Sequence, residues 1–390
     1  MRRLLCAVVA ALACVASTDV AASRAAAVAA GLDKAAAVAA PVPNASAFYV
    51  VNASNGEVLA SHDAQVELPI ASITKLMTVI VALQHLKPDD EVTVTGSAAQ
   101  VGESRIPLVA GQRVTVRDLL KGALIQSANN AADALAAAAS GGDVERFVSW
   151  MNARARAIGL HHTHFARPDG LDAPGHVSSA RDVAVLAQVA MHSPVVRSLV
   201  RERTDTIEGG RFVVHTWNDL LGVVPGLIGV KTGHTNDSGW CQVAAVRRHG
   251  YTIYAVILGS PTRAQRNDDL ERLLAWGVAQ YRTSTLVRRA VYAQAALGYG
   301  RRPVALVAAK PLVRVVRAGR PLVERVIAPS AVSLPVARGQ RLGRVEVWDG
   351  GTLIGARPLL AARSVPRPGL AGRLRWYATR TGHHLLGLFS

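Results

Sequence analysis

The chain contains few cysteines, and their positions limit the covalent chemistry open to it. Only 3 of its 390 residues are cysteine, and two of these, Cys6 and Cys14, lie close to the N-terminus. If an N-terminal leader that includes both is removed, Cys241 remains alone, which excludes an internal disulfide in the mature chain. The apolar run near the N-terminus is also short: residues 4–15 are fewer than the roughly 20 residues that cross a bilayer as a helix.

The first 22 residues are predicted to be a signal peptide (1–22). Arg2 and Arg3 precede the apolar run, and the small residues 20–22 follow it, as at a cleavage site. Residues 23–43 are rich in alanine and end in Pro-Val-Pro, which predicts a linker. We therefore expect an exported protein, periplasmic or otherwise extracytoplasmic, and peripheral to the outer face of the cytoplasmic membrane.

Lysine is scarce although the chain is basic. Of 44 Lys and Arg residues only six are lysine, and Lys75 alone among them has a serine three residues before it. Apolar residues recur at helical spacing over residues 72–86, which predicts a helix with Ser72 in its first turn and Lys75 on the same face. A serine becomes a nucleophile when a base takes its proton, and lysine can be that base, whereas arginine cannot. The pair alone does not distinguish a catalytic dyad from a helix cap followed by a solvated lysine.

Positive charge is concentrated in the last part of the chain. The net charge is +17, and residues 285–390 hold 18 Lys and Arg against 3 Asp and Glu, a net charge of +15. Such asymmetry indicates a region that meets an anionic partner, either a membrane surface or nucleic acid. Residues 369–390 mix leucine and aromatic residues with arginine, as in an amphipathic tail that lies on anionic lipid. Because an exported protein rarely meets nucleic acid, we expect the anionic membrane surface to be the partner.

The periodicity predicts an α+β catalytic domain over residues 44–284. A β-hairpin over residues 46–61 turns at Asn55-Gly56, and residues 240–246 and 252–258 alternate with period two, as strands do. The predicted helices cover residues 72–86, 114–139 with a break in the middle, 144–158, 180–192 and 263–281. We expect an antiparallel sheet flanked by helices with a helical insertion, followed by a small all-β domain over residues 285–368.

Two later stretches supply what a serine acyl-transfer enzyme needs beyond a nucleophile and a base. Ser127-Ala128-Asn129 interrupts a helical segment, so it places a hydroxyl and an amide at a loop where Asn129 could hold a substrate peptide group. Lys231-Thr232-Gly233 ends an apolar strand, where a cation and a hydroxyl could bind a carboxylate and glycine permits close backbone approach. Lys231 is also expected to lower the pKa of Lys75 if the two cations are close. Each stretch alone is weak evidence.

Taken together and in this order, Ser-x-x-Lys, Ser-x-Asn and Lys-Thr-Gly are the signature of penicillin-binding proteins and class A β-lactamases. Residues 70–78 (IASITKLMT), 126–132 (QSANNAA) and 229–235 (GVKTGHT) resemble the low-molecular-mass penicillin-binding proteins. Within that group the sequence is similar to the serine D-alanyl-D-alanine carboxypeptidases typified by penicillin-binding protein 5. The resemblance covers roughly residues 45–365, so it includes the predicted all-β domain and implies that family's penicillin-binding/β-lactamase-like transpeptidase fold.

The resemblance implies a role for each residue of the first two motifs. Ser72 would form an acyl-enzyme with the penultimate D-Ala of the substrate, and Lys75 would be the general base. Ser127 would relay a proton, and Asn129 would orient the peptide.

The third motif would hold the rest of the substrate. Lys231 and Thr232 would bind the terminal carboxylate, Gly233 would allow close approach, and the backbone N–H of His234 would form the oxyanion hole with that of the serine. Arg266 aligns with a family arginine near the carboxylate, but it is equally well explained as an ordinary charged residue of the last predicted helix.

The leading hypothesis is an exported carboxypeptidase that removes the terminal D-Ala from peptidoglycan stem peptides ending in D-Ala-D-Ala, and that β-lactam antibiotics acylate. A β-lactamase is the second hypothesis. It would need a carboxylate base in a loop between the second and third motifs, where Asp169 and Asp172 are the candidates, and it would leave the all-β domain unexplained. A non-catalytic cell-wall binding protein is the third, although every motif residue is intact.

Several other residues were considered as metal ligands or site residues, and the sequence does not support either role for them. His161, His162 and His164 are close together, but no carboxylate or cysteine pattern accompanies them, so we predict neither a metal nor a cofactor. Cys241 and Trp240 are expected to be core side chains.

Overall fold

The computed structural model describes residues 39–248 and 250–386. The predicted signal peptide and most of the predicted linker lie outside the described residues, as do the last four residues of the predicted tail. The chain forms two compact units that divide after Arg282.

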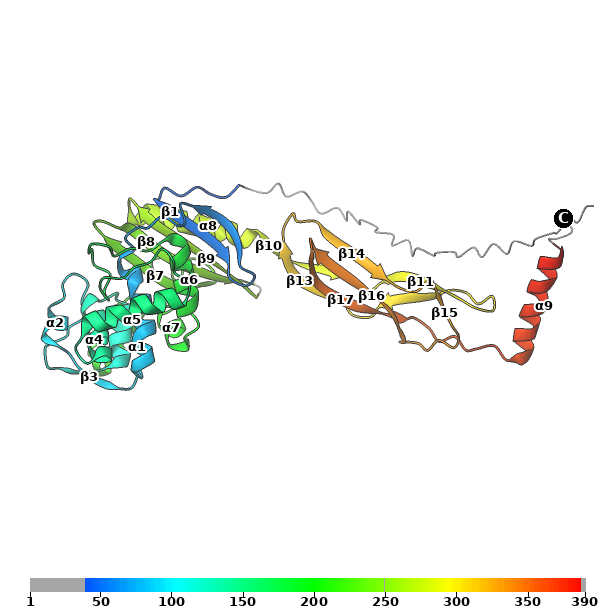
Figure 1. Ribbon diagram of the computed structural model, residues 1–390, viewed down its shortest axis with the longest axis horizontal. Helices are drawn as coiled ribbons and strands as arrows, with labels where there is room; N and C mark the ends of the chain where they lie inside the picture. The colour runs from blue at the N-terminus through cyan, green and yellow to red at the C-terminus, as the bar shows by residue number, and fades with distance from the viewer. Residues whose placement is uncertain (1–38, 249, 387–390) are drawn as a thin grey trace, which may run out of the picture. The chain divides into compact units, whose positions relative to one another are not determined.

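The first unit is built on a five-stranded antiparallel sheet with the strand order β2-β1-β9-β8-β7 (Figure 1). Its strands are β1 (Ala47–Asn52), β2 (Glu57–His62), β7 (Leu227–Thr235), β8 (Gly239–Arg248) and β9 (Tyr251–Ser260). Most residues of β8 and β9 are buried whichever face they point to. Strands covered on both faces read as nearly continuous apolar runs, so the period-two alternation expected for residues 240–246 and 252–258 is not matched by an alternation in burial.

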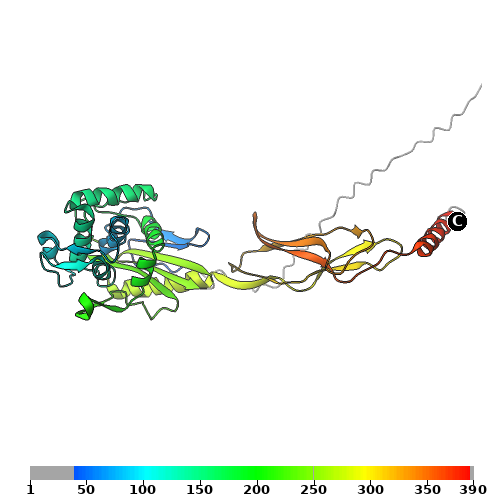
Figure 2. The same ribbon diagram turned by 90° about the horizontal axis from the view of Figure 1, so that it is seen from below.

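Helices cover the two faces of this sheet. α8 (Arg263–Ala279) packs on one face, where Gly277 permits close approach because a Cβ there would lie 3.0 Å from Ile253. α6 (Ala180–Ala190) packs on the opposite face, against β1, β8 and β9 (Figure 2). The sheet is therefore the central layer of a three-layer unit.

α1 (Lys75–His85) lies inside the helical cluster, and seven of its residues are buried. Its neighbours are α3 (Val116–Leu124), α4 (Asn129–Ser140) and α5 (Val144–Ala157). The side chains of Thr115, Asp143 and Ser179 each accept a hydrogen bond from the backbone N–H three residues later, which fixes where α3, α5 and α6 begin. The remaining elements are η1 (Ala71–Thr74), β3 (Glu91–Thr93), α2 (Gly96–Gln100), β4 (Arg113–Thr115), α7 (Pro194–Leu199), β5 (Thr204–Ile207), η2 (Glu208–Gly210) and β6 (Phe212–His215).

The predicted helix at Ser72 differs from the observed one at its start. Ser72 lies in the 3₁₀ turn η1, and the α-helix begins only at Lys75. Ala71 has a φ of +48°, and the Ile73 N–H donates to the carbonyl of Ile70, three residues back, which tightens the turn. The spacing of hydrophobic residues does not distinguish a 3₁₀ turn from the first turn of an α-helix.

The second unit is rich in β-structure. It contains a six-stranded sheet of order β14-β16-β17-β12-β11-β15 and a β10-β13 pair. The strands are β10 (Tyr281–Val287), β11 (Val291–Leu297), β12 (Val304–Ala308), β13 (Leu312–Arg317), β14 (Leu322–Ile327), β15 (Ala331–Val332), β16 (Arg341–Asp349) and β17 (Thr352–Ala361). Val287, Leu306, Val345 and Leu359 are fully buried in its core. The predicted fold class, an α+β unit followed by a β-rich one, is confirmed.

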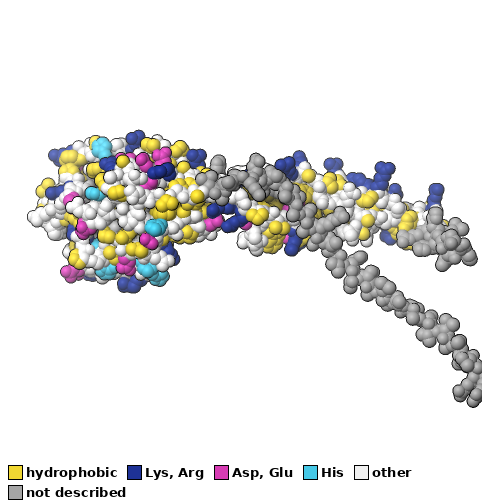
Figure 3. Space-filling view, turned by 90° about the horizontal axis from the view of Figure 1, so that it is seen from above, with side chains coloured by type: hydrophobic (Ala, Val, Ile, Leu, Met, Phe, Trp, Pro, Cys, Tyr) yellow, Lys and Arg dark blue, Asp and Glu magenta, His cyan; other side chains and the backbone are white. Residues whose placement is uncertain are grey.

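The surface of the second unit carries much of the positive charge, and Lys and Arg side chains are spread over it (Figure 3). The unit ends in α9 (Leu370–Leu386), where the ring of Trp376 lies 5.4 Å from that of Tyr299. Leu370, Leu374 and Tyr377 of α9 are exposed. Within the described residues, no helix combines the length and the apolar character needed to cross a bilayer.

Shortening a core side chain of the first unit tests its packing. Phe147 on α5 is fully buried, so Phe147→Ala should lower the free energy of unfolding by about 3–5 kcal/mol, through lost burial and the cavity left behind. Urea unfolding of the full chain measures this. Val213→Ala, at a side chain 55% exposed, is the control and should change the free energy by less than about 0.5 kcal/mol. Equal effects of the two substitutions would contradict the described core.

Candidate active site

The serine and the lysine of the first motif are in direct contact. Lys75 Nζ lies 2.7 Å from Ser72 Oγ and donates a hydrogen bond to it. Ser72 is on the turn η1, and Lys75 is the first residue of α1, with a side chain that is fully buried. The structure thus excludes the alternative in which Lys75 is a solvated surface charge.

Two further acceptors fix the orientation of the Lys75 amine. Its Nζ also donates to Asn129 Oδ1 at 2.7 Å and to the backbone carbonyl of Asp169 at 2.6 Å. The three protons of the ammonium form therefore have three acceptors. When one proton leaves, the two remaining N–H bonds can stay on Asn129 and Asp169, and the lone pair then points to the Ser72 hydroxyl.

Burial lowers the pKa of Lys75 to about 8, although nearby carboxylates, Asp169 foremost, oppose the shift. At pH 7 about one-tenth of the molecules would therefore hold a neutral amine at this position. We expected Lys231 to help lower this pKa; burial is the main cause, and the cation that contributes to the lowering is Arg167. Lys231 itself has a pKa well below the usual value, first through burial and then through the nearby charges of Lys75 and Arg266.

Of the two buried carboxyl groups near Lys75, Asp169 keeps its negative charge and Asp133 does not. Two hydrogen bonds from Arg167, at 2.6 and 2.7 Å, and one from the Leu171 N–H hold the Asp169 carboxylate. Burial raises the pKa of Asp169, but these hydrogen bonds outweigh it and leave the pKa below its usual value. Burial raises the pKa of the neighbouring Asp133, and the Asp169 charge raises it further, so Asp133 favours its neutral form.

The second motif lies opposite the nucleophile, at the turn between α3 and α4. Ser127 has a φ of +62°, which is rare for a residue other than glycine, and its Oγ accepts a hydrogen bond of 2.7 Å from Lys231 Nζ. Lys231 Nζ also donates to the Thr232 carbonyl at 2.9 Å. The second and third motifs are thereby joined through a buried lysine.

Strand β7 carries the third motif directly against the Ser72 turn. A Cβ at Gly233 would lie 2.7 Å from the Ile70 carbonyl oxygen and 3.2 Å from the Ser72 nitrogen, so only glycine fits without a shift. Thr232 lies on the pocket wall before this glycine. His234 follows it with an exposed ring, 4.0 Å from the ring of Trp240 on β8.

Arg266 reaches the same pocket from α8. It is only 1% exposed and lies over Trp240, with its guanidinium carbon 5.6 Å from the ring centroid. Its terminal nitrogen lies 3.4 Å from Asp219, and burial lowers its pKa to about 10. A charge on the outer face of a helix would not be buried in this way, so the structure favours a place in the site over a surface role.

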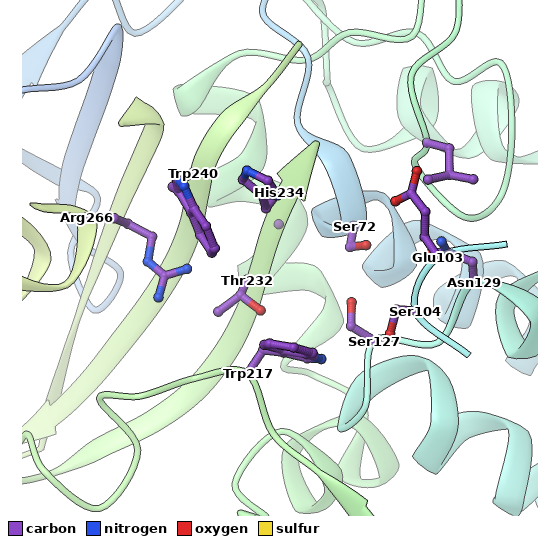
Figure 4. Close-up of a pocket in the computed structure, with 12 residues that line it drawn as sticks. Ser72, Glu103, Ser104, Ser127, Asn129, Trp217, Thr232, His234, Trp240 and Arg266 are labelled. Carbon is purple, nitrogen blue, oxygen red and sulfur yellow. The ribbon is translucent and has the colours of Figure 1, made fainter. Parts of the chain in front are cut away.

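These residues enclose one pocket, shown in Figure 4. Its wall includes seven of the nine predicted site residues: Ser72, Ser127, Asn129, Thr232, Gly233, His234 and Arg266. The other two, Lys75 and Lys231, are buried behind the wall and contact its hydroxyl groups.

Sequence reasoning missed the remaining wall residues. Trp240, expected in the core, lines the pocket with Trp217, Glu103, Ser104 and Leu171. No motif marks the loop before β4 that carries Glu103 and Ser104. Its hydrogen bonds to Asn129 and to the Gln126 carbonyl place it at the site.

Comparisons with known proteins identify the family to which the chain belongs. Residues 34–262 match the family of D-alanyl-D-alanine carboxypeptidases, and residues 281–367 match the C-terminal domain of penicillin-binding protein 5. The D-alanyl-D-alanine carboxypeptidase DacC of Escherichia coli (strain K12) is 32% identical over 374 residues, which cover 89% of this chain and 91% of that protein.

Solved structures are similar as well. Penicillin-binding protein 5 of Haemophilus influenzae has a TM-score of 0.62 at 27% identity, over 85% of this chain and 100% of that chain. Penicillin-binding protein D2 of Listeria monocytogenes, in an ampicillin-bound form, has a TM-score of 0.55 at 30% identity, over 60% of this chain and 98% of that chain. Because the match to the catalytic family covers more than half of the sequence, the chain belongs to the D-alanyl-D-alanine carboxypeptidase family, with a C-terminal domain of the penicillin-binding protein 5 type.

Proposed function

We propose that the protein is an active serine carboxypeptidase that removes the terminal D-Ala from peptidoglycan stem peptides through an acyl-enzyme on Ser72. The observation that carries this proposal is the contact between Lys75 Nζ and Ser72 Oγ at 2.7 Å, with Asn129 and Asp169 holding the rest of the amine. A base fixed in this way satisfies the geometric requirement for activating a hydroxyl. Relatives named as D-Ala-D-Ala carboxypeptidases and an ampicillin-bound neighbour support the same substrate and inhibitor classes.

In acylation, Ser72 Oγ attacks the carbonyl carbon of the penultimate D-Ala and gives its proton to neutral Lys75. The backbone N–H groups of Ser72 and His234 donate to the oxyanion that forms. As the C–N bond breaks, Ser127, held by Lys231, passes its proton to the leaving D-Ala amine and receives in exchange the proton that Lys75 took from Ser72, so Lys75 is neutral again. The products are an ester on Ser72 and free D-Ala.

Binding of the terminal carboxylate falls to the cationic end of the pocket. Thr232 and Arg266 line that end, and Lys231 lies behind it. Arg266 is suited to this task because it is buried and still cationic near neutral pH, with a pKa of about 10. In deacylation, neutral Lys75 takes a proton from water, and the water oxygen attacks the ester carbonyl. As the Ser72 ester bond breaks, Lys75 returns that proton to Ser72 Oγ and the shortened peptide is released.

A β-lactamase is less well supported. The two carboxylates considered as its deacylation base already have partners: Arg167 binds Asp169, and the Thr235 hydroxyl donates to Asp172 at 2.6 Å. The β-lactamase hypothesis also does not explain the β-rich second unit. A non-catalytic binding protein would not need the buried lysine at the serine.

We also propose that the protein is exported and that α9 attaches it to an anionic membrane surface. Leu370, Leu374 and Tyr377 are spaced i, i+4 and i+7, so they share one face of α9, and all three are exposed. The arginine-rich second unit would add electrostatic attraction to anionic headgroups.

Removing the nucleophile tests the proposed activity. Ser72→Ala should abolish the release of D-Ala from a peptide that ends in D-Ala-D-Ala, and should prevent covalent labelling by benzylpenicillin. Amine analysis and intact-protein mass spectrometry measure the two effects. Ser149→Ala, at an exposed serine of α5, is the matched control and should retain both. Persistent release in Ser72→Ala, or rapid benzylpenicillin turnover by the wild type, would refute the assignment.

The pH dependence tests the base. Because neutral Lys75 is the active form and its pKa is about 8, kcat/KM should rise about tenfold per pH unit below pH 7.5 and level off above about 8. Lys75→Arg should be inactive at every pH, since arginine keeps its proton. Lys121→Arg, which can keep the ion pair with Asp205, is the control and should show the wild-type profile. A rate independent of pH between 6 and 8 would be inconsistent with Lys75 as the base.

Membrane attachment is tested by co-sedimentation with vesicles rich in phosphatidylglycerol. Leu370→Glu combined with Leu374→Glu should move most of the protein to the supernatant, as should removal of residues 370–390. Val323→Glu alters a side chain on β14 that is 53% exposed and should leave partitioning unchanged. If the wild type and the α9 variant partition equally, α9 is not the anchor.

A further inference from the structure

The loop residue Glu103 is held at the active site from both sides. Asn129 Nδ2 donates to the Gly102 carbonyl at 3.0 Å, and the Asn129 backbone N–H donates to the Ser104 carbonyl at 2.7 Å. Ser104 Oγ also donates to the Gln126 carbonyl at 3.0 Å. The residue between these anchors therefore cannot move freely, although it lies on a loop.

The backbone at Glu103 is in an unusual conformation. Its φ is +61°, in the left-handed region that residues other than glycine rarely adopt. Such strain persists where the surrounding structure imposes it, and it is concentrated at functional sites. The anchored loop imposes it here, and the side chain lies on the pocket wall as a result.

Charge along the pocket changes sign across the nucleophile. Figure 4 shows Arg266 and Thr232 on one side of Ser72 and Glu103 on the other. Within the part of the chain that the structure describes, no Lys, Arg or His forms an ion pair with Glu103. The charge of Glu103 also acts on the amine of Lys75. It raises the pKa of that amine, although less than the charges of Asp169 and Asp133 do.

The polarity of the pocket indicates which part of a substrate meets Glu103. If the cationic end holds the terminal carboxylate, the acyl part of the peptide leaves Ser72 toward Glu103 and Leu171. Leu171, also on the wall, offers an apolar surface for methylene groups. A pocket wall that offers both a carboxylate and an apolar side chain is complementary to an alkyl chain that ends in an ammonium group.

We propose that Glu103 binds the primary ammonium group on the side chain of the residue that precedes D-Ala-D-Ala. The enzyme then selects stem peptides with a free diamino-acid side chain over peptides in which that amine is acylated, as it is after crosslinking. This inference rests on the carboxypeptidase activity proposed above and names the feature of the peptide that this active site selects.

The test compares two peptides that differ by one acetyl group: Nα-acetyl-L-Lys-D-Ala-D-Ala, with a free side-chain amine, and its Nα,Nε-diacetyl form. At low ionic strength the wild type should favour the free amine by only about fivefold in kcat/KM, because Glu103 is exposed to solvent. The preference should shrink in 0.5 M salt. Glu103→Gln should bring the ratio close to one, and Glu103→Lys should invert it. Glu145→Gln, at an exposed carboxylate of α5, should keep the wild-type ratio.

Other outcomes separate the two proposals. If the wild type cleaves both peptides equally well, or Glu103→Gln slows both by the same factor, the ammonium site is wrong while the carboxypeptidase assignment stands. In the second case Glu103 acts in chemistry common to both substrates. If the wild type cleaves neither peptide, the carboxypeptidase assignment fails and the ammonium site fails with it. Benzylpenicillin labelling and the urea midpoint of Glu103→Gln exclude misfolding as the cause of a changed ratio.

Discussion

The active site depends on a lysine amine that is held away from water. An ammonium group in a protein interior is costly unless each of its protons finds an acceptor. For Lys75 these acceptors come from three separate segments: the turn before α1, the start of α4, and the loop after Arg167. The hydrogen bonds that offset the free-energy cost of burying the ammonium group therefore also orient the amine toward the Ser72 hydroxyl. Losing any one segment would leave a charged group with an unmet donor.

Much of the local strain in the first unit lies around this amine. Ala71, Glu103 and Ser127 all have positive φ, in three different segments, and each borders the same pocket or its nucleophile. Such conformations cost on the order of 1–3 kcal/mol each, so the rest of the fold must supply that stability. The buried sheet and the capped helices described above provide it. Rigid layers on both faces hold short, strained segments in positions they would not adopt alone.

The sequence predicted the three motifs and their order, because catalysis requires particular side chains at particular spacings. It also predicted the main helices and strands, since each follows an apolar period. It did not predict the 3₁₀ turn at Ser72, where Ala71 has a positive φ and its carbonyl packs closely against Gly170, a contact between segments distant in sequence. Trp240 was assigned to the core because an apolar residue at the start of a strand looks the same in sequence whether its side chain is in the core or on a pocket wall. No sequence motif marks Glu103, and the hydrogen bonds that hold its loop to Asn129 and Gln126 reveal its position.

Strand β7 is the last strand in the order of the sheet, so one of its edges has no strand partner within the described residues. Proteins usually protect such an edge, because any extended chain can pair with it. Here the same edge strand carries Lys231 and Thr232, which are proposed to bind the peptide terminus. A substrate laid along it would act as a temporary sixth strand, recognised by main-chain hydrogen bonds that are indifferent to side-chain identity. Discrimination among peptides would then be left to the few side chains that border this added strand.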